Sequence, residues 1–271
     1  MLISLILFLA VFALIWILLL QTRTKTPEQM QELKQWRYAH RGYHNETLPE
    51  NSLGAFRRAV EEGFGAELDV HLSKDGKLIV HHDESLLRLC GEDVNICDLT
   101  AEELQKYRLA GTDEPIPSLD QVLTLFENKA PLVIELKTFK GNAAALCDAV
   151  MARLSSYKGL YCVESFDPRV LLHLKKHYPQ VIRGQLSENY FRHHAKLNPV
   201  LKFLLHNLLL NFLTRPDFIA FHVLDWDDRS FTLCRRFYHP SLFGWTIRTK
   251  EEQATVERSG GVIIFEQFDP R

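Results

Sequence analysis

The spacing of apolar and polar residues divides this chain into one long apolar segment followed by short alternating strands and helices. Residues 66–72 give the clearest strand, because apolar residues alternate with Glu67, Asp69 and His71, and period two is typical of a half-buried strand. Further apolar runs predict strands at 36–40, 78–80, 132–136, 161–163, 181–185, 218–221, 242–245 and 262–265.

Helical spacing of apolar residues follows several of these strands. It predicts helices at 49–62, 119–127 and 142–155, and a short helix after Thr100, where Thr100 to Glu103 forms a capping box. Between 84 and 117 the pattern weakens. Strands that alternate with helices imply a parallel sheet, and about eight strands favour a closed α/β barrel over an open sheet.

The first twenty residues contain one polar residue, Ser4, and no charge. About 20 apolar residues span a bilayer, so 1–21 is expected to be an uncleaved membrane anchor, 22–35 a tether and 36–271 the main domain. A signal peptide would need a basic start and a small-residue cleavage site, and a buried core helix is the other alternative. Arg23 and Lys25 follow the span, which favours a cytoplasmic main domain.

Residues 199–213 form a second apolar segment, PVLKFLLHNLLLNFL. It is too short and too interrupted to cross a bilayer. Its apolar residues extend beyond one helical face. Two interpretations remain: a barrel helix packed on the core, or a lip that enters the membrane interface beside the anchor.

Composition narrows the class of protein. The chain has 271 residues, 46% of them hydrophobic, which suits one barrel domain. The net charge of −2, with both signs mixed along the chain, gives no indication of a nucleic-acid partner. The five cysteines are odd in number and lack a CxxC pair, so we expect free, buried or half-buried thiols.

Polar residues gather where strands are predicted to end. A barrel enzyme collects its active site in this way, with one or two residues from each of several strand ends. The groups are His40-Arg41-Gly42, Pro49-Glu50-Asn51-Ser52, Glu67-Leu68-Asp69, His82-Asp83 and Glu135-Leu136-Lys137.

Three of these residues, Glu67, Asp69 and Glu135, are carboxylates in predicted strands, where an unpaired charge is costly to bury. A hard divalent cation, Mg²⁺ or Ca²⁺, would compensate them through oxygen ligands. Ion pairs with Arg41 or Lys137 are the alternative. Glu67 and Asp69 lie two residues apart on one strand and therefore point the same way, which favours the metal.

His40 and His82 each end a strand beside this acidic cluster. Two such histidines suit acid–base chemistry at phosphorus, and Arg41 and Lys137 would hold phosphate oxygens. His71 should share the face of Asp69 but lacks the strand-end placement of His40 and His82, so a structural role is favoured and a role as metal ligand or support is the alternative. The chain has no GxSxG, Walker A or HExxH motif.

From Trp36 to Lys137 these groups resemble, in order and spacing, the successive motifs of the glycerophosphodiester phosphodiesterase family. Beyond that stretch the resemblance is looser. The family usually has a small hydrophobic residue and Asn after Trp245-Thr246, and Thr-Asp after the last strand. This chain has Ile247-Arg248 and Phe265-Glu266. We expect both departures at the rim, where they would affect substrate preference and leave the metal and histidines unaffected.

The resemblance implies an α/β TIM (β/α)8 barrel with a small insertion after the second strand, at about 83–117. It implies hydrolysis of glycerophosphodiesters to glycerol 3-phosphate and an alcohol, with one Mg²⁺ or Ca²⁺. The implied roles are acid–base catalysis by His40 and His82, metal binding by Glu67, Asp69 and Glu135, substrate contact by Arg41, Lys137 and Trp245, and support by Glu50 and Asn51.

Lysophospholipids are alternative substrates, given the anchor and the apolar segment 199–213. A non-catalytic membrane scaffold is a second class, but every expected catalytic position holds a competent residue. A metal-dependent amidohydrolase is a third, and it would require a His-x-His pair that this chain lacks. Nothing in the sequence implies a protein partner; the expected partners are a phosphodiester and the membrane.

Overall fold

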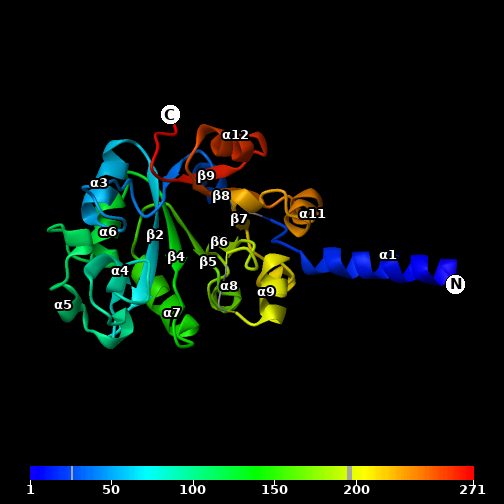
Figure 1. Ribbon diagram of the computed structural model, residues 1–271, viewed down its shortest axis with the longest axis horizontal. Coiled ribbons are helices and arrows are strands. Elements are labelled where there is room, and N and C mark those ends of the chain that lie inside the picture. The colour runs from blue at the N-terminus through cyan, green and yellow to red at the C-terminus, as the bar shows by residue number, and fades with distance from the viewer. Residues whose placement is uncertain (26, 194–196) are drawn as a thin grey trace.

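The computed structural model describes residues 1–25, 27–193 and 197–271 and shows a closed barrel of eight parallel strands (Figure 1). The first strand pairs with both the second and the last, which closes the barrel. One further strand, β3, pairs antiparallel with β2. The strands are β1 Tyr38–Ala39, β2 Gly65–Leu72, β3 Leu78–Val80, β4 Leu132–Leu136, β5 Tyr161–Ser165, β6 Arg183–Ser187, β7 Phe218–His222, β8 Ser241–Ile247 and β9 Val262–Phe265.

The helices of the described chain surround this barrel, apart from α1. They are α1 Leu2–Leu19, α2 Gln29–Leu33, α3 Leu53–Glu61, α4 Leu87–Cys90, α5 Ala101–Leu104, α6 Leu119–Phe126, α7 Ala143–Leu154, α8 Pro168–His177, α9 Pro199–His206, α10 Asn211–Thr214, α11 Arg229–Tyr238 and α12 Lys250–Arg258, with short 3₁₀ turns η1 Ile96–Asp98, η2 Leu109–Gly111 and η3 Val223–Asp225. The expected barrel fold is therefore confirmed, and so is the capping box at Thr100.

Inside the barrel, the amino-terminal end is apolar and the carboxyl end is acidic. Tyr38 and Phe218 pack with Val133 in one buried cluster that fills the floor. Two residues after Val133, the same face of β4 presents Glu135. The apolar floor thus leaves the carboxyl ends of the strands for polar side chains.

The helix predicted at 49–62 begins later than expected, at Leu53. Asn51 has a φ of +57°, outside the helical region, and Ser52 is extended and caps the helix by accepting a hydrogen bond from Ala55 N. The prediction was wrong at this end because Pro49 belongs to the loop before the cap.

The apolar segment 199–213 is also broken, into α9 and α10. Leu208 has a φ of +56°, a left-handed conformation that stops a helix. The side chains of Leu205, Leu208 and Leu209 are buried, whereas Val200 and Phe203 are exposed. One part of the segment therefore packs on the core, and another faces solvent.

Residues 83–117 hold α4, η1, α5 and η2 between β3 and the helix that precedes β4. This region has its own small core beside the barrel. Its buried members are Ile79, Leu86, Ile96, Leu104, Leu109 and Ile116.

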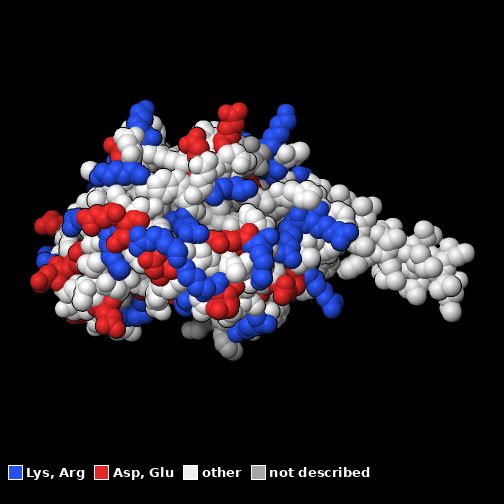
Figure 2. Space-filling view, turned by 90° about the horizontal axis from the view of Figure 1, so that it is seen from above, with Lys and Arg blue, Asp and Glu red and all other residues white. Residues whose placement is uncertain are grey.

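Helix α1 projects away from the barrel, and only its last turns touch it (Figure 1). Trp16 Nε1 donates to Ser230 Oγ at 3.2 Å, and Tyr238 donates to the carbonyl oxygen of Ile17 at 2.8 Å. The projecting part carries no Lys, Arg, Asp or Glu side chain (Figure 2). Among the described residues, α1 is the one helix long and apolar enough to cross a membrane.

The described residues of the expected tether pack against the barrel. Met30 and Leu33 of α2 are fully buried at its floor, and Arg23 forms an ion pair with Asp217 at 3.2 Å. Residue 26 lies outside the described residues. As expected, all five cysteines are free, three of them buried and two half-buried.

Candidate active site

Four carboxylates from three neighbouring strands lie at the carboxyl end of the barrel. The parallel register pairs Asp69 with Glu135 and Glu135 with Glu164, so these residues share one level. Glu67 completes the group from β2. All four are buried. The ligand atoms of Glu67, Asp69 and Glu135 lie within 4.8 Å of one another.

Two cations compensate part of this charge. Lys137 Nζ lies 3.1 Å from Asp69 Oδ1 and 2.8 Å from Glu135 Oε2, and Arg41 Nε lies 3.5 Å from Asp69 Oδ2. The ion pairs considered from the sequence therefore form. The four carboxylates still exceed these cations by two negative charges.

The uncompensated charge is visible in the pKa values. Burial raises the pKa of Glu67, Glu135 and Glu164 above the ordinary value, and the neighbouring carboxylates raise it further. Burial also opposes ionisation of Asp69, but Lys137, His82 and Arg41 hold its pKa well below the usual range. Glu164 Oε2 is buried and has no hydrogen-bond partner among the described residues.

These residues fit a hard divalent cation. Carboxylate oxygens are the ligands that Mg²⁺ and Ca²⁺ prefer, and two charges would neutralise the excess. The cavity beside them measures about 40 Å³ and is lined by Glu67, Glu135 and Glu164, among others. That volume suits an ion with a few waters.

His40, at the end of β1, is held by a carboxylate from the far end of the chain. Its Nδ1 lies 2.6 Å from Glu266 Oε2, and its Nε2 lies 3.9 Å from Glu67 Oε2. Burial lowers the pKa of His40 to about 4, although Glu266 opposes this shift. His40 is therefore neutral at pH 7, with Nε2 toward the acidic cluster.

His82 has its own carboxylate partner next in sequence. Its Nδ1 lies 2.6 Å from Asp83 Oδ1, and Arg88 Nε donates to the other oxygen of Asp83 at 2.5 Å. His71 Nε2 pairs with the carbonyl oxygen of His82 at 3.1 Å. His71 thus contacts the His82 loop, and it lies outside the group of three carboxylates that could hold a metal ion.

Arg41 lies in a sharply turned loop after β1. Its φ of +53° directs its backbone N–H to Glu67 Oε2 at 2.9 Å, while its side chain donates to Glu50 Oε1 at 2.8 Å. Gly42, at φ +81°, packs so closely on Ala55 that a Cβ would lie 3.0 Å from it. The strained backbone therefore fixes Arg41 against the site.

Asn51 reaches the same site from the loop before α3. Its Nδ2 donates to Asp69 Oδ2 at 2.8 Å. Glu50 contacts Arg41 and also accepts hydrogen bonds from both terminal nitrogens of Arg88, at 2.7 and 2.9 Å. Asn51 thus contacts one of the clustered carboxylates, and Glu50 contacts Arg41 and Arg88.

The opposite wall of the cavity is largely apolar. It is formed by Phe166, Leu186, Trp245 and Ile264. The Trp245 ring packs against Phe166 with centroids 5.5 Å apart. Trp245 Nε1 is buried without a hydrogen-bond partner among the described residues, so it is free to donate to a bound molecule.

Sequence reasoning did not assign Asp83, Glu164 and Glu266 to the site. The sequence could have indicated two of them: Asp83 follows His82 directly, and Glu164 lies at an inward-facing position of the alternation in its strand. Glu266 follows β9, and its contact with His40 differs from the expectation that this departure leaves the histidines unaffected. Glu266 bonds His40 and forms an ion pair with Arg248, so the two departures from the family pattern contact each other.

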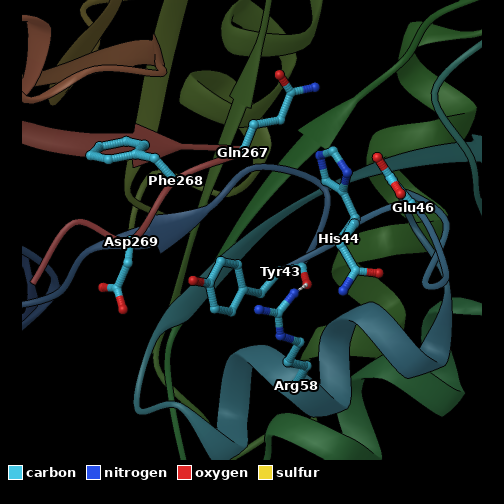
Figure 3. Close-up of a pocket in the computed structure, with 8 residues that line it drawn as sticks. Tyr43, His44, Glu46, Arg58, Gln267, Phe268 and Asp269 are labelled. Carbon is cyan, nitrogen blue, oxygen red and sulfur yellow. Dashed lines mark hydrogen bonds between the residues drawn. The ribbon is translucent and has the colours of Figure 1, made fainter.

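A larger cavity, of about 670 Å³, lies outside this site (Figure 3). Tyr43, Arg58 and Phe268 are among its lining residues, and Arg58 donates to the carbonyl oxygen of Tyr43 at 3.1 Å. One of its lining residues, His44, reaches the site, since His44 Nε2 lies 3.5 Å from Glu266 Oε2. It contains none of the four clustered carboxylates.

Solved structures share this fold and arrangement of elements. A phosphodiesterase from Oleispira antarctica in complex with the product sn-glycerol-3-phosphate aligns with a TM-score of 0.70 and 22% identity, over 85% of this chain and 92% of that one. A glycerophosphodiester phosphodiesterase from Thermotoga maritima aligns with a TM-score of 0.65 and 29% identity, over 84% and 92%. The fold is thus a TIM barrel that this chain shares with these two solved phosphodiesterase structures.

The family model of the glycerophosphoryl diester phosphodiesterase family matches residues 40–265. The chain belongs to this family.

Individual proteins with glycerophosphodiester phosphodiesterase or lysophospholipase D names are similar to this chain in sequence. A glycerophosphodiester phosphodiesterase from Caldanaerobacter subterraneus is 35% identical over 55% of this chain and 65% of its own. The human lysophospholipase D GDPD1 is 37% identical over 42% and 41%. Human glycerophosphodiester phosphodiesterase 1 is 25% identical over 81% and 73%. The chain therefore spans less than two thirds of the length of the first two.

Proposed function

We propose that this protein hydrolyses glycerophosphodiesters to glycerol 3-phosphate and an alcohol, with a divalent cation and two histidines. The observation that carries this proposal is the geometry of the site. His40 and His82 line one cavity, each with its Nδ1 at 2.6 Å from a carboxylate, beside an acidic cluster with two uncompensated charges.

In this proposal Glu67, Asp69 and Glu135 hold the ion, Mg²⁺ or Ca²⁺. When bound, the ion supplies Lewis-acid polarisation of the phosphate and neutralises part of its charge. Arg41 and Lys137 line the cavity and supply further positive charge for the phosphate oxygens.

The two histidines divide the proton transfers. Glu266 holds the Nδ1 proton of His40, so its neutral Nε2 accepts a proton from the attacking hydroxyl. That hydroxyl belongs to water, or to the glycerol of the substrate, in which case a cyclic phosphate forms first and water opens it. His82 donates a proton to the leaving alcohol as its bond to phosphorus breaks.

The test uses the full chain in detergent micelles with glycerophosphocholine, in Mg²⁺, Ca²⁺ or EDTA. We expect release of glycerol 3-phosphate that EDTA abolishes and that His40→Ala lacks. His173→Ala is the matched control, since this surface histidine also contacts a carboxylate, Asp148. Equal turnover by the wild type and His40→Ala, or no turnover with any ion, would contradict the proposal.

Lysophospholipids are a second candidate class of substrate, and an apolar groove favours them. The groove measures about 470 Å³ and includes Tyr190, Leu201 and Leu205. Phe166 lines both this groove and the catalytic cavity, so an acyl chain in the groove would leave the phosphate near the histidines. The similarity to lysophospholipase D GDPD1 supports the same class.

The groove also lies close to the proposed membrane anchor. Phe203 of α9 packs against Trp16 of α1 with ring centroids 5.7 Å apart, and Val200 is exposed on the same helix. We propose that 1–21 anchors the protein, that 36–271 is the phosphodiesterase domain, and that α9 enters the interface beside the anchor. Arg23 and Lys25 favour a cytoplasmic domain.

Leu201→Glu tests the groove, because a buried charge opposes binding of an acyl chain. We expect turnover of lysophosphatidylcholine to fall at least about tenfold relative to glycerophosphocholine. Leu172→Glu, on the exposed side of α8, is the control. An unchanged ratio of the two turnover rates would show that the groove does not bind the acyl chain. If both rates fall together, the substitution has disturbed the fold or the catalytic cavity.

A further inference from the structure

A second group of metal-binding side chains lies at the carboxyl ends of β6 and β7, outside the acidic cluster. It consists of His193 in the loop after β6, His222 at the end of β7, and Asp225 in η3. Their ligand atoms lie within 4.8 Å of one another. The function proposed above uses none of these three residues.

The spacing of the donor atoms is that of a tetrahedral zinc site. With bonds of about 2.0 Å, two donors of such a site lie roughly 3.3 Å apart. His193 Nε2 lies 3.1 Å and His222 Nδ1 lies 3.8 Å from Asp225 Oδ2. Both distances lie within about half an ångström of that spacing, and the two imidazole nitrogens lie within 4.8 Å of each other.

Hydrogen bonds within the group do not account for the position of His222 Nδ1. It is buried, it has no hydrogen-bond partner among the described residues, and 3.8 Å from Asp225 is too long for a hydrogen bond. A buried ring nitrogen without a partner is costly, and a bound cation would satisfy it. By contrast, His206 lies 3.1 Å from its carboxylate partner, Asp228.

The carboxylate of this group is already oriented by the residues around it. Arg192 donates to Asp225 Oδ1 at 2.6 Å, and the backbone N–H of Asn189 donates to Oδ2 at 2.8 Å. Such outer contacts fix the direction of a metal ligand. A carboxylate oxygen that accepts one hydrogen bond keeps a lone pair for an ion.

We propose that His193, His222 and Asp225 form a Zn²⁺ site distinct from the Mg²⁺ or Ca²⁺ site. Two imidazoles and one carboxylate suit zinc, whereas the all-carboxylate cluster suits a hard cation. The ion joins the loop after β6 to the end of β7. Because the His222 ring packs on Trp245 at 4.9 Å, the ion also steadies one wall of the catalytic cavity.

The experiment uses the full chain without a polyhistidine tag, in detergent micelles and excess Mg²⁺. It is dialysed against micromolar Zn²⁺, and bound zinc is counted by elemental analysis. We expect the wild type to retain one Zn²⁺ more per chain than His193→Ala or His193→Ala/His222→Ala. His206→Ala is the matched control and should bind as the wild type does.

Two further measurements make the result independent of activity. Zn²⁺ should raise the Tm of the wild type and of His206→Ala, but not of His193→Ala, by mass action on the folded state. Co²⁺ should give a ligand-field spectrum that the same variant lacks. His193 lies on a half-buried loop position, so this variant keeps the test valid if the double variant fails to fold. Equal zinc counts in the wild type and His193→Ala, or none in either, would overturn the site.

Discussion

The two halves of the barrel rim differ in chemistry. The half built by β1, β2, β3 and β4 supplies nearly all the ionisable groups of the cavity: His40, Arg41, Glu67, His82, Glu135 and Lys137. The half built by β5 to β9 supplies Phe166, Leu186, Trp245 and Ile264, with Glu164 as its one charge in the cavity lining.

This difference follows from the register of neighbouring strands. The proposed metal ligands Glu67, Asp69 and Glu135 come from two adjacent strands, and the register sets Asp69 level with Glu135 and with Glu164 on the next strand. The facing wall then has no such constraint and can be shaped for a substrate. We therefore expect changes in the first half to affect the rate, and changes in the second half to affect recognition.

The largest effect is expected from Asp69→Asn, which breaks the centre of the first half. Asp69 contacts Lys137, Arg41 and Asn51, so the substitution removes a proposed metal ligand and one of the two carboxylate partners that each of these cations has. Turnover should fall by more than about 10³-fold, and Mg²⁺ or Ca²⁺ binding by calorimetry should be lost. Asp148→Asn, on the surface, should retain both.

His82→Ala should reduce kcat by about 10²- to 10⁴-fold, because it removes the proposed proton donor. The substrate with a good leaving group, such as a p-nitrophenyl ester, needs that proton least. The His82→Ala variant should therefore lose less activity with this ester than with glycerophosphocholine. The same loss with both substrates would assign His82 to another role.

Glu266→Gln tests a side-chain contact that joins the two halves at His40, the proposed base. Glutamine cannot stabilise the protonated imidazole that forms as His40 accepts a proton, so we expect kcat to fall by roughly 10- to 100-fold with little change in KM. Asp83→Asn is the counterpart for His82. A change in KM alone would show that Glu266 acts in substrate recognition and does not assist His40.

Phe166→Ala probes the second half. The aromatic ring lines both cavities, and its loss should raise KM for a lysophospholipid by roughly three- to tenfold with kcat nearly constant. Steady-state kinetics separates the two constants. A drop in kcat equal to that of His82→Ala would contradict the division between the halves.

The smallest effect is expected in the pH dependence of kcat/KM on the acid side. Burial lowers the pKa of His40 from 6.5 to about 4, so the proposed base stays neutral as the pH falls from 7 to about 5. Protonation below that range removes the base, and kcat/KM should then fall as the pH approaches about 4. A limb centred near 6.5 would contradict a base whose pKa is lowered by burial.

Local patterning was enough to predict much of the fold and the first half of the site. The alternation in 66–72 placed Glu67 and Asp69 on one face, and the run 132–136 is the observed β4 with Glu135 directed inward. These predictions succeeded because strand periodicity fixes which side chains point the same way, whatever the rest of the chain does.

Only the tertiary structure decided the contacts between distant segments. Closure of the barrel places β9 beside β1, and this brings Glu266 to His40 across 226 positions of sequence. The same closure buries Met30 and Leu33 of the expected tether at the barrel floor. Periodicity describes neighbours along one strand or helix. The pairing of two chain ends depends instead on packing that the whole barrel must satisfy at once.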